Sequence, residues 1–126
     1  MTRINSGIPP AELTDKHLLA EHREIKRIPN VIKSGRYSLE GIPEEFKLGT
    51  GHVKFFYNKL KYLSKRYEAL YQECVARGFN MTYFGNAFKG LPPELFNDYE
   101  PTPKGIAEVR ERIRERLSGI TWKPGS

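Results

Sequence analysis

The sequence has little cysteine and no long apolar run. Cys74 is the single thiol in 126 residues, so an intrachain disulfide cannot form, which fits a reducing compartment. No stretch approaches the about 20 consecutive apolar residues that a transmembrane helix needs. The N-terminus also lacks the basic-then-apolar pattern of a signal peptide. We therefore expect an intracellular, soluble protein.

Several catalytic signatures are absent as well. The three histidines and Cys74 do not form a zinc signature, because residues 17–22 (HLLAEH) lack the spacing of a helical His-Glu-x-x-His site. The sequence has no glycine-rich phosphate loop and no Gly-x-Ser-x-Gly elbow. Cys74 falls on an apolar stripe, where a small core residue is expected. None of these common metal-binding or catalytic signatures is therefore available to suggest a function.

The chain carries an excess of positive charge and enough apolar residues for one core. Its net charge is +6, and 38% of its residues are hydrophobic. A length of 126 residues suits a single domain. The charge suits a polyanionic partner, either nucleic acid or an anionic membrane surface. A basic charge alone is weak evidence for either partner, because many soluble proteins share it.

Apolar residues recur at spacings of three and four in three stretches, which predicts three helices. The first would run from about Pro10 to Arg27, after an extended arm at residues 1–9. Pro29 would break this helix near Ile28. The second and clearest helix would cover about residues 51–77.

The second predicted helix has a continuous apolar stripe and ends at Gly78, which suits a C-terminal cap. The stripe consists of Val53, Phe56, Leu60, Leu63, Tyr67, Leu70 and Cys74. Thr102 would cap the third helix, with Pro103 in its first position. Its apolar face would contain Ile106, Val109, Ile113 and Leu117. The charges of both signs on its other face are typical of a solvated surface.

The stretches between these helices, residues 29–49 and 79–101, are interrupted by glycine and proline and predict loops. We therefore expect an all-α protein, a single compact domain over residues 1–126. Three main helices would pack around a long central helix, with long connecting loops. We expect a monomer.

The chain terminus is the first candidate for chemistry. Because Thr2 is small, cellular removal of Met1 would leave a free α-amine on Thr2. The reference pKa of an α-amine is about 7.7–8.0, against about 10.4 for lysine, so far more of it is neutral at pH 7. Arg3 would further favour the neutral form. Such an amine can attack an electrophilic carbon and form a Schiff base. An ordinary mobile terminus is the alternative, since many proteins begin Met-Thr.

The first predicted helix supplies a carboxylate beside cations. Lys16, Arg23 and Arg27 form a basic stripe at helical spacing. Glu24 falls between this stripe and the apolar face, next to His17, where it would be half sheltered. A surface ion-pair set is the alternative interpretation of Glu24 and the arginines. His17 has its own alternative, as a polar edge of the core.

Short motifs along the chain match one known family in their order. They are Met-Thr-Arg-Ile-Asn at residues 1–5, then His17-Leu18, Ala20-Glu21 and Arg23-Glu24 through Arg27, then Phe46-x-Leu48-Gly49-x-Gly51-His52-Val53-x-Phe55-Phe56-Tyr57-x-Lys59-Leu60, then Lys65-Arg66 and Glu73-Cys74-x-x-Arg77-Gly78-Phe79-Asn80, and more weakly Pro92, Glu94, Asp98, Tyr99 and Pro101. In this respect the chain resembles the phage-type pyrimidine-dimer DNA glycosylases, also called endonuclease V (the ultraviolet-repair enzyme).

The resemblance implies an all-α, bifunctional DNA glycosylase with AP-lyase activity and no metal or cofactor. It implies that the Thr2 amine attacks the anomeric carbon of the damaged nucleotide's sugar, which releases one glycosidic bond and leaves an imine. β-Elimination would then break the strand on the 3′ side. Glu24 would stabilise the developing sugar cation and assist proton movement.

The resemblance also implies a DNA partner and no membrane partner. The substrate would be double-stranded DNA that contains pyrimidine dimers or abasic sites, kinked and with the base opposite the lesion flipped out. Arg3, Arg23 and Arg27 would hold phosphates around the lesion, with His17 at the same site. Such a protein would act wherever the genome is, and a viral origin would fit the family.

Two departures from the family bear on specificity. The family's aromatic and basic C-terminal tail stops here soon after Trp122 and Lys123, and the loop between Arg27 and Phe46 is shorter. The lesion range and the accepted dimer stereochemistry therefore stay open. Two alternatives follow: the same chemistry directed at a different lesion, or a non-catalytic DNA-binding module on the same scaffold. Retention of Met1 would favour the module.

Overall fold

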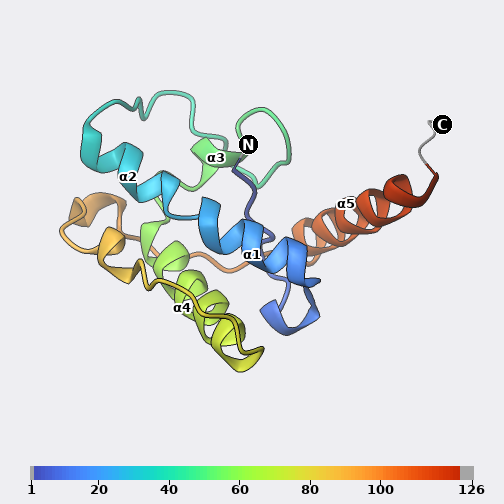
Figure 1. Cartoon of the computed structure of the whole chain (residues 1–126). Helices are drawn as coiled ribbons and strands as arrows, with labels where there is room; N and C mark the ends of the chain where they lie inside the picture. The colour runs from blue at the N-terminus through green and yellow to red at the C-terminus, as the bar shows by residue number, and fades with distance from the viewer. Residues whose placement is uncertain (1, 123–126) are drawn as a thin grey trace.

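The regular structure of the described chain is helical. The computed structural model describes residues 2–122, with side chains through residue 116. Its helices are α1 (Asp15–Glu24), α2 (Arg27–Ser34), α3 (His52–Phe55), α4 (Leu60–Ala76) and α5 (Pro103–Trp122), with 3-10 turns η1 (Pro10–Glu12), η2 (Gly85–Phe88) and η3 (Pro93–Leu95) (Figure 1). No strand occurs between residues 2 and 122, so the predicted all-α class is confirmed. None of the described helices is long and apolar enough to cross a membrane.

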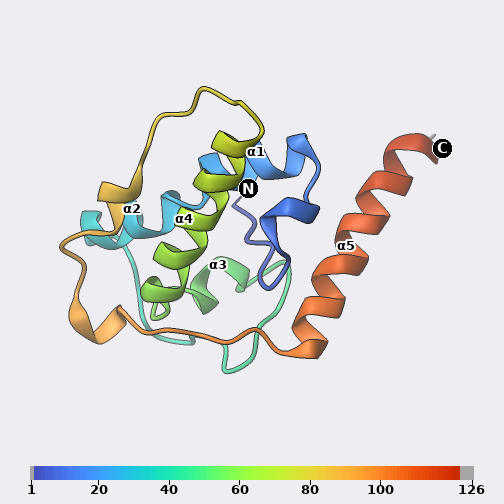
Figure 2. The same ribbon diagram turned by 90° about the horizontal axis from the view of Figure 1, so that it is seen from below.

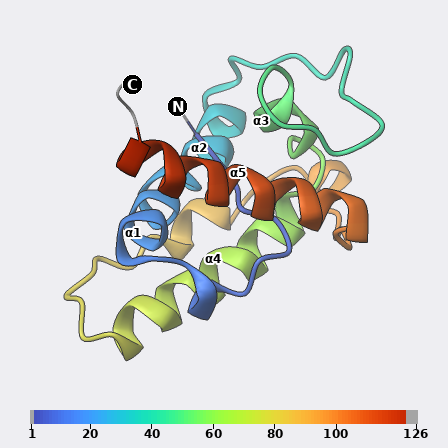
Figure 3. The same ribbon diagram turned by 90° about the vertical axis from the view of Figure 1, so that its right-hand side faces the viewer.

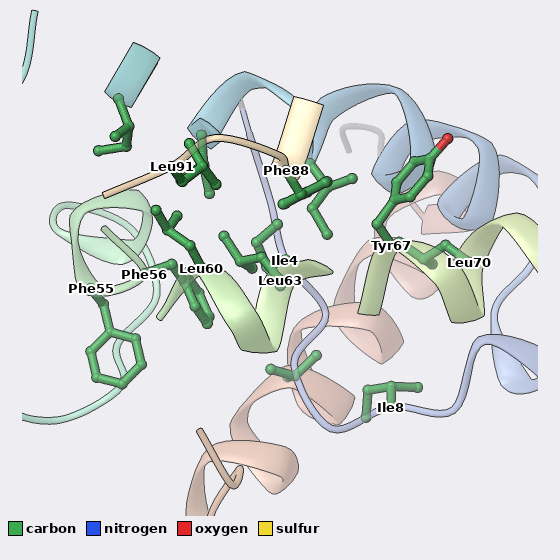
Figure 4. Packing of buried hydrophobic residues seen from close by; sticks show 14 of the residues in the cluster. Ile4, Ile8, Phe55, Phe56, Leu60, Leu63, Tyr67, Leu70, Phe88 and Leu91 are labelled. Atoms are coloured by element: carbon green, nitrogen blue, oxygen red, sulfur yellow. The ribbon is translucent and has the colours of Figure 1, made fainter. Parts of the chain in front are cut away.

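Helix α4 is the centre of the core. Its apolar stripe is buried along its whole length, as the spacing predicts: Leu60, Leu63, Tyr67, Leu70 and Cys74. Helix α1 and the turns η1 and η2 all contact α4. Figure 4 shows Ile4 from the N-terminal segment beside Leu63, with Phe88 and Leu91 on the other side of the cluster. The stripe therefore forms the core.

The predicted helix over residues 10–27 is divided into separate pieces. Turn η1 ends at Glu12, and Thr14 then caps α1, because its side-chain oxygen accepts the His17 backbone N–H at 3.2 Å. Helix α1 ends at Glu24. The predicted start at Pro10 therefore holds for a 3-10 turn only.

The predicted break near Ile28 was wrong. The chain turns at residues 25–26 and continues as α2, with Pro29 in its first turn. A proline in the first turn lacks an N–H that would have no helical partner there, so it costs no hydrogen bond. Gly35 ends α2 with a φ of +76°. Residues 29–34, predicted as loop, are therefore helical.

The predicted helix over residues 51–77 also has a break. Helix α3 ends at Phe55, a turn follows, and α4 begins at Leu60. The turn allows Phe55 and Phe56 to be buried together, although neighbours on a helix point about 100° apart. The Lys59 ammonium donates to the Phe55 carbonyl at 3.0 Å, which satisfies a helix-end acceptor. Gly78, with a φ of +84°, ends α4 as predicted.

Helix α5 lies against the N-terminal segment and projects away from the body (Figures 2 and 3). Thr102 caps it as predicted, since its side chain accepts the Gly105 N–H at 3.0 Å. Val109 is buried, and Ile106 packs directly against Gly7 of the N-terminal segment. A Cβ atom added to Gly7 would lie 2.4 Å from the Cγ1 atom of Ile106, so a larger residue does not fit at position 7. The side chain of Leu117 and the tail at residues 123–126 lie outside the described part of the chain.

Candidate active site

The N-terminal segment, residues 2–9 and hereafter the arm, has no regular secondary structure and runs past α3 and α1 (Figure 1). Side chains from distant elements hold its backbone. The Ile4 N–H donates to His52 Nε2 at 2.9 Å, and the Gly7 N–H donates to the Tyr62 hydroxyl at 3.2 Å. The arm is thus fixed from α3 and α4.

A buried ion pair extends this anchoring. Arg66 and Glu21 are 8% and 1% exposed, and the guanidinium binds the carboxylate through Nε at 2.5 Å and Nη2 at 3.0 Å. Arg66 also donates to the Ile8 carbonyl at 2.8 Å. Asn5 donates to Glu21 at 2.9 Å and accepts from Arg112 of α5 at 3.0 Å. Each buried charge therefore has polar partners, as burial demands.

Glu24 lies at the start of the arm. Its Oε1 accepts the Arg3 backbone N–H at 3.3 Å, and its Oε2 lies 3.5 Å from Arg23 Nη2. The Glu24 side chain is 14% exposed, whereas the Arg23 side chain is 61% exposed. The predicted half-sheltered carboxylate is therefore present, and it binds the backbone of Arg3, the residue next to Thr2.

Thr2 and Arg3 line a pocket of about 510 Å³. The other lining residues come from the loop before α3, from α3 and the turn after it, and from α5: Gly49, Gly51, His52, Val53, Lys54, Tyr57 and Arg112. Three lining side chains carry positive charge, and the lining contains no carboxylate. Such a pocket favours an anionic ligand.

Cations gather on the α5 side of the arm. Partial burial lowers the pKa of His17, and the charges of Arg116, Lys16, Arg112 and Arg3 lower it further. Burial also lowers the pKa of Arg112 to about 10, with Arg3 acting in the same direction. Helix α5 thus adds positive charge to the region that holds Thr2.

His52 is a neutral anchor. It is 3% exposed, its Nδ1 bonds to the Lys47 carbonyl at 2.9 Å, and its Nε2 accepts the Ile4 N–H at 2.9 Å. The two bonds together require the neutral form with hydrogen on Nδ1. Burial lowers its pKa to about 4, which maintains this form at neutral pH.

The structure brings together most of the residues chosen from the sequence. Thr2, Arg3 and Glu24 are adjacent, Arg23 contacts Glu24, and His17 lies within the influence of Arg3. Arg27 is separated from this group by the turn and lies exposed at the start of α2. The described residues contain no group of three or more His, Cys, Asp or Glu side chains arranged for a metal ion.

Sequence reasoning missed the polar residues that fix the arm. Glu21 gave a signal, because it occupies the apolar face of the predicted first helix, where a carboxylate needs a buried partner. His52 was considered only as a metal ligand. Arg112 gave no signal and was expected on a solvated face, but it is partly buried beside Asn5.

A comparison with known protein families bears on this arrangement. The family described as pyrimidine dimer DNA glycosylase matches residues 1–84, two thirds of the 126-residue chain. The matched part contains the arm, Glu24, His52 and all of α4, whereas α5 follows it. The chain therefore belongs to the pyrimidine dimer DNA glycosylase family, and DNA is its substrate.

Proposed function

We propose that this protein cleaves the N-glycosidic bond at ultraviolet-induced cyclobutane pyrimidine dimers in double-stranded DNA. It then nicks the strand by β-elimination, through an imine with the α-amine of Thr2. The observation that carries the proposal is the contact between Glu24 Oε1 and the Arg3 N–H, 3.3 Å, which supports a carboxylate beside the reacting amine.

In the first step the neutral amine attacks C1′ of the damaged nucleotide. The bond from C1′ to the pyrimidine nitrogen breaks, and its electron pair leaves with the base, whose nitrogen takes up a proton. The amine then loses its protons, and C1′ and the nitrogen form an imine as the bond from C1′ to O4′ opens and O4′ takes up a proton. Glu24 stabilises the positive charge that develops on the sugar and carries these protons, roles that suit a sheltered carboxylate.

The exposed cations position the DNA. Arg23 and Arg27 are exposed on α1 and α2, and His17 lies nearer to the arm. Contacts from such side chains to phosphates fix the register of the duplex without reading sequence. Arg3 joins them from the arm, next to the reacting residue.

Borohydride trapping tests the proposal. The protein, with loss of Met1 verified by mass spectrometry, is mixed with irradiated, abasic or intact duplex DNA, and borohydride reduces any imine to a stable covalent complex. We expect complexes with irradiated and abasic DNA. Glu24→Gln should slow trapping on irradiated DNA about 100-fold or more, since general acid–base groups contribute that much. Glu45→Gln, in an exposed loop position, is the matched control.

Other outcomes select other functions. Trapping with abasic DNA alone would indicate the same amine chemistry directed at a different lesion. No trapping by a correctly processed protein that still binds irradiated DNA would contradict the amine mechanism and leave a non-catalytic DNA-binding module. Blocking the Thr2 amine by acetylation should abolish trapping, and trapping that survived would place the nucleophile elsewhere.

A further inference from the structure

The pocket beside Thr2 contains more positive charge than the attack on C1′ requires. Arg3, Lys54 and Arg112 reach it from the arm, α3 and α5, and Tyr57 adds an aromatic wall. Glu24 is not among its lining residues. Attack on a sugar carbon needs a neutral amine and a nearby carboxylate, so Lys54 and Arg112 have no role in that step and need another explanation.

Arg112 differs from its neighbours on α5. Arg110 pairs with Glu12 and Arg114 pairs with Glu111, and both arginine side chains are exposed. Among the described residues, no carboxylate lies within ion-pair distance of Arg112, whose hydrogen bond goes to the neutral Asn5 amide at 3.0 Å.

The carboxylate that acts on Arg112 is already bound to another residue. The carboxylate of Glu21 favours the charged form of Arg112, but it is held by Arg66 at 2.5 Å and 3.0 Å. A partly buried cation without a counter-ion is costly unless an anion binds to it. The missing counter-ion of Arg112 would be supplied by an anionic group of the bound substrate.

We propose that this pocket binds the phosphate that leaves during β-elimination, which becomes the 5′-phosphate end of the nicked strand. The inference rests on the proposed function and deepens it. In this step a base removes the C2′ proton, and the C2′–H electron pair forms the C2′=C3′ double bond. The C3′–O3′ bond breaks, and its electron pair leaves with O3′ as part of the phosphate.

Charge development explains why cations belong there. A phosphodiester carries one negative charge, whereas the phosphomonoester it becomes carries about −1.5 to −2 at pH 7. Cations that gain attraction as this charge develops lower the barrier of the elimination step. The imine holds C1′ on the Thr2 nitrogen, and Thr2 lines the pocket, so the phosphate beyond C2′, C3′ and O3′ lies within its reach.

Two rates measured on one substrate test the assignment. The full-length, processed protein reacts in single turnover with duplex DNA that contains one abasic site. Borohydride trapping gives the rate of imine formation, and strand cleavage without borohydride gives the rate of elimination. We expect Lys54→Gln to slow cleavage about 10- to 100-fold with trapping nearly unchanged, so that imine accumulates. Arg112→Gln also loses the bond to Asn5 in the arm, so it should slow trapping to some extent and cleavage by a clearly larger factor. Arg114→Gln, exposed on the same helix, is the control.

A less charged linkage sharpens the test. A methylphosphonate on the 3′ side of the abasic site is neutral before cleavage, and its leaving group carries about one negative charge instead of about −1.5 to −2. On this substrate Arg112→Gln should slow cleavage by a smaller factor than on the phosphodiester. Equal slowing of trapping and cleavage on both substrates would overturn the assignment and make Arg112 a support for the arm. No trapping by the wild-type protein would instead refute the proposed function, and this inference with it.

Discussion

The arm and helix α4 differ in the contacts that hold them in place. Helix α4 buries an apolar stripe, and burying each leucine of such a stripe contributes about 1.5–3 kcal/mol without directional demands. The arm also buries Ile4 and Ile8, but its backbone is fixed in addition by hydrogen bonds with the side chains of His52, Tyr62 and Arg66. A core tolerates swaps of similar volume, whereas a directional bond is lost when its partner changes. Stability and the placement of the N-terminal arm are thus separable.

The largest expected effect comes from the buried pair that joins the two regions. Glu21→Ala leaves Arg66 as an uncompensated buried charge, and it should lower the free energy of unfolding by about 3–5 kcal/mol. Urea unfolding followed by circular dichroism measures this. Asp98→Asn, which breaks the exposed pair with Lys65, should cost less than about 1 kcal/mol. Similar losses in the two variants would mean that Glu21 does not join the regions.

A pair of substitutions separates core from arm. Leu70→Ala should cost about 2–5 kcal/mol of stability but leave trapping by the folded protein nearly unchanged. Tyr62→Phe removes the hydroxyl that contacts Ser6 and Gly7 and should cost only about 1 kcal/mol. It should nevertheless slow trapping about tenfold or more, because small misplacements of reacting groups are expensive. The reverse ranking in the trapping assay would contradict the comparison.

The core could be predicted from the sequence because apolar spacing and helix-cap residues are local signals. Apolar spacing predicted the α4 stripe, and the cap residues Gly78 and Thr102 were recognised by type and position. The breaks between helical segments could not be predicted in this way, because they depend on which residues are buried in the folded protein. Phe55 and Phe56 are both buried across the turn after α3, and no periodic pattern signals such a break.

The candidate site could be predicted from the sequence only in part. Thr2 and Glu24 were chosen from their chemistry and from the motif. The structure brings the arm and α1 together through contacts between residues that are far apart in sequence. His52 and Arg112 lie about 48 and 107 positions from the arm residues they bind. Pairing over such separations has no periodicity, and a polar face on a helix does not reveal which charges another segment will cover. The roles of all these residues in the reaction stay predictions.

The pH dependence of stability tests the neutral His52 anchor. Its folded pKa of about 4 lies below the ordinary value of 6.5, so the unfolded chain binds more protons between these values. Its stabilising contribution is complete above pH 6.5 and declines as the pH falls towards 4. Between pH 7 and pH 5 the wild type should lose about 2 kcal/mol more than His52→Gln, which cannot titrate.

The comparison between the wild type and His52→Gln isolates the contribution of His52 to the pH dependence of stability. The pKa values of His17 and His22 are also lowered, but both groups are present in the wild type and in His52→Gln, so their contributions cancel in the difference. Urea unfolding at the two pH values gives the two losses. Parallel losses would show that the bonds from His52 to Ile4 and Lys47 do not depend on its neutral form.

The smallest effect is expected at the exposed edge of the site, where neither burial nor a directional anchor operates. Arg23 is 61% exposed and lies 3.5 Å from Glu24, so Arg23→Gln should change stability by less than about 1 kcal/mol. If Arg23 contacts a phosphate, the slope of log affinity against log salt should fall by about one. Fluorescence anisotropy with irradiated duplex DNA over a salt series measures the slope, with Lys61→Gln on α4 as the control. A slope that changed equally in both variants would assign the effect to net charge, and Arg23 would then hold no particular phosphate.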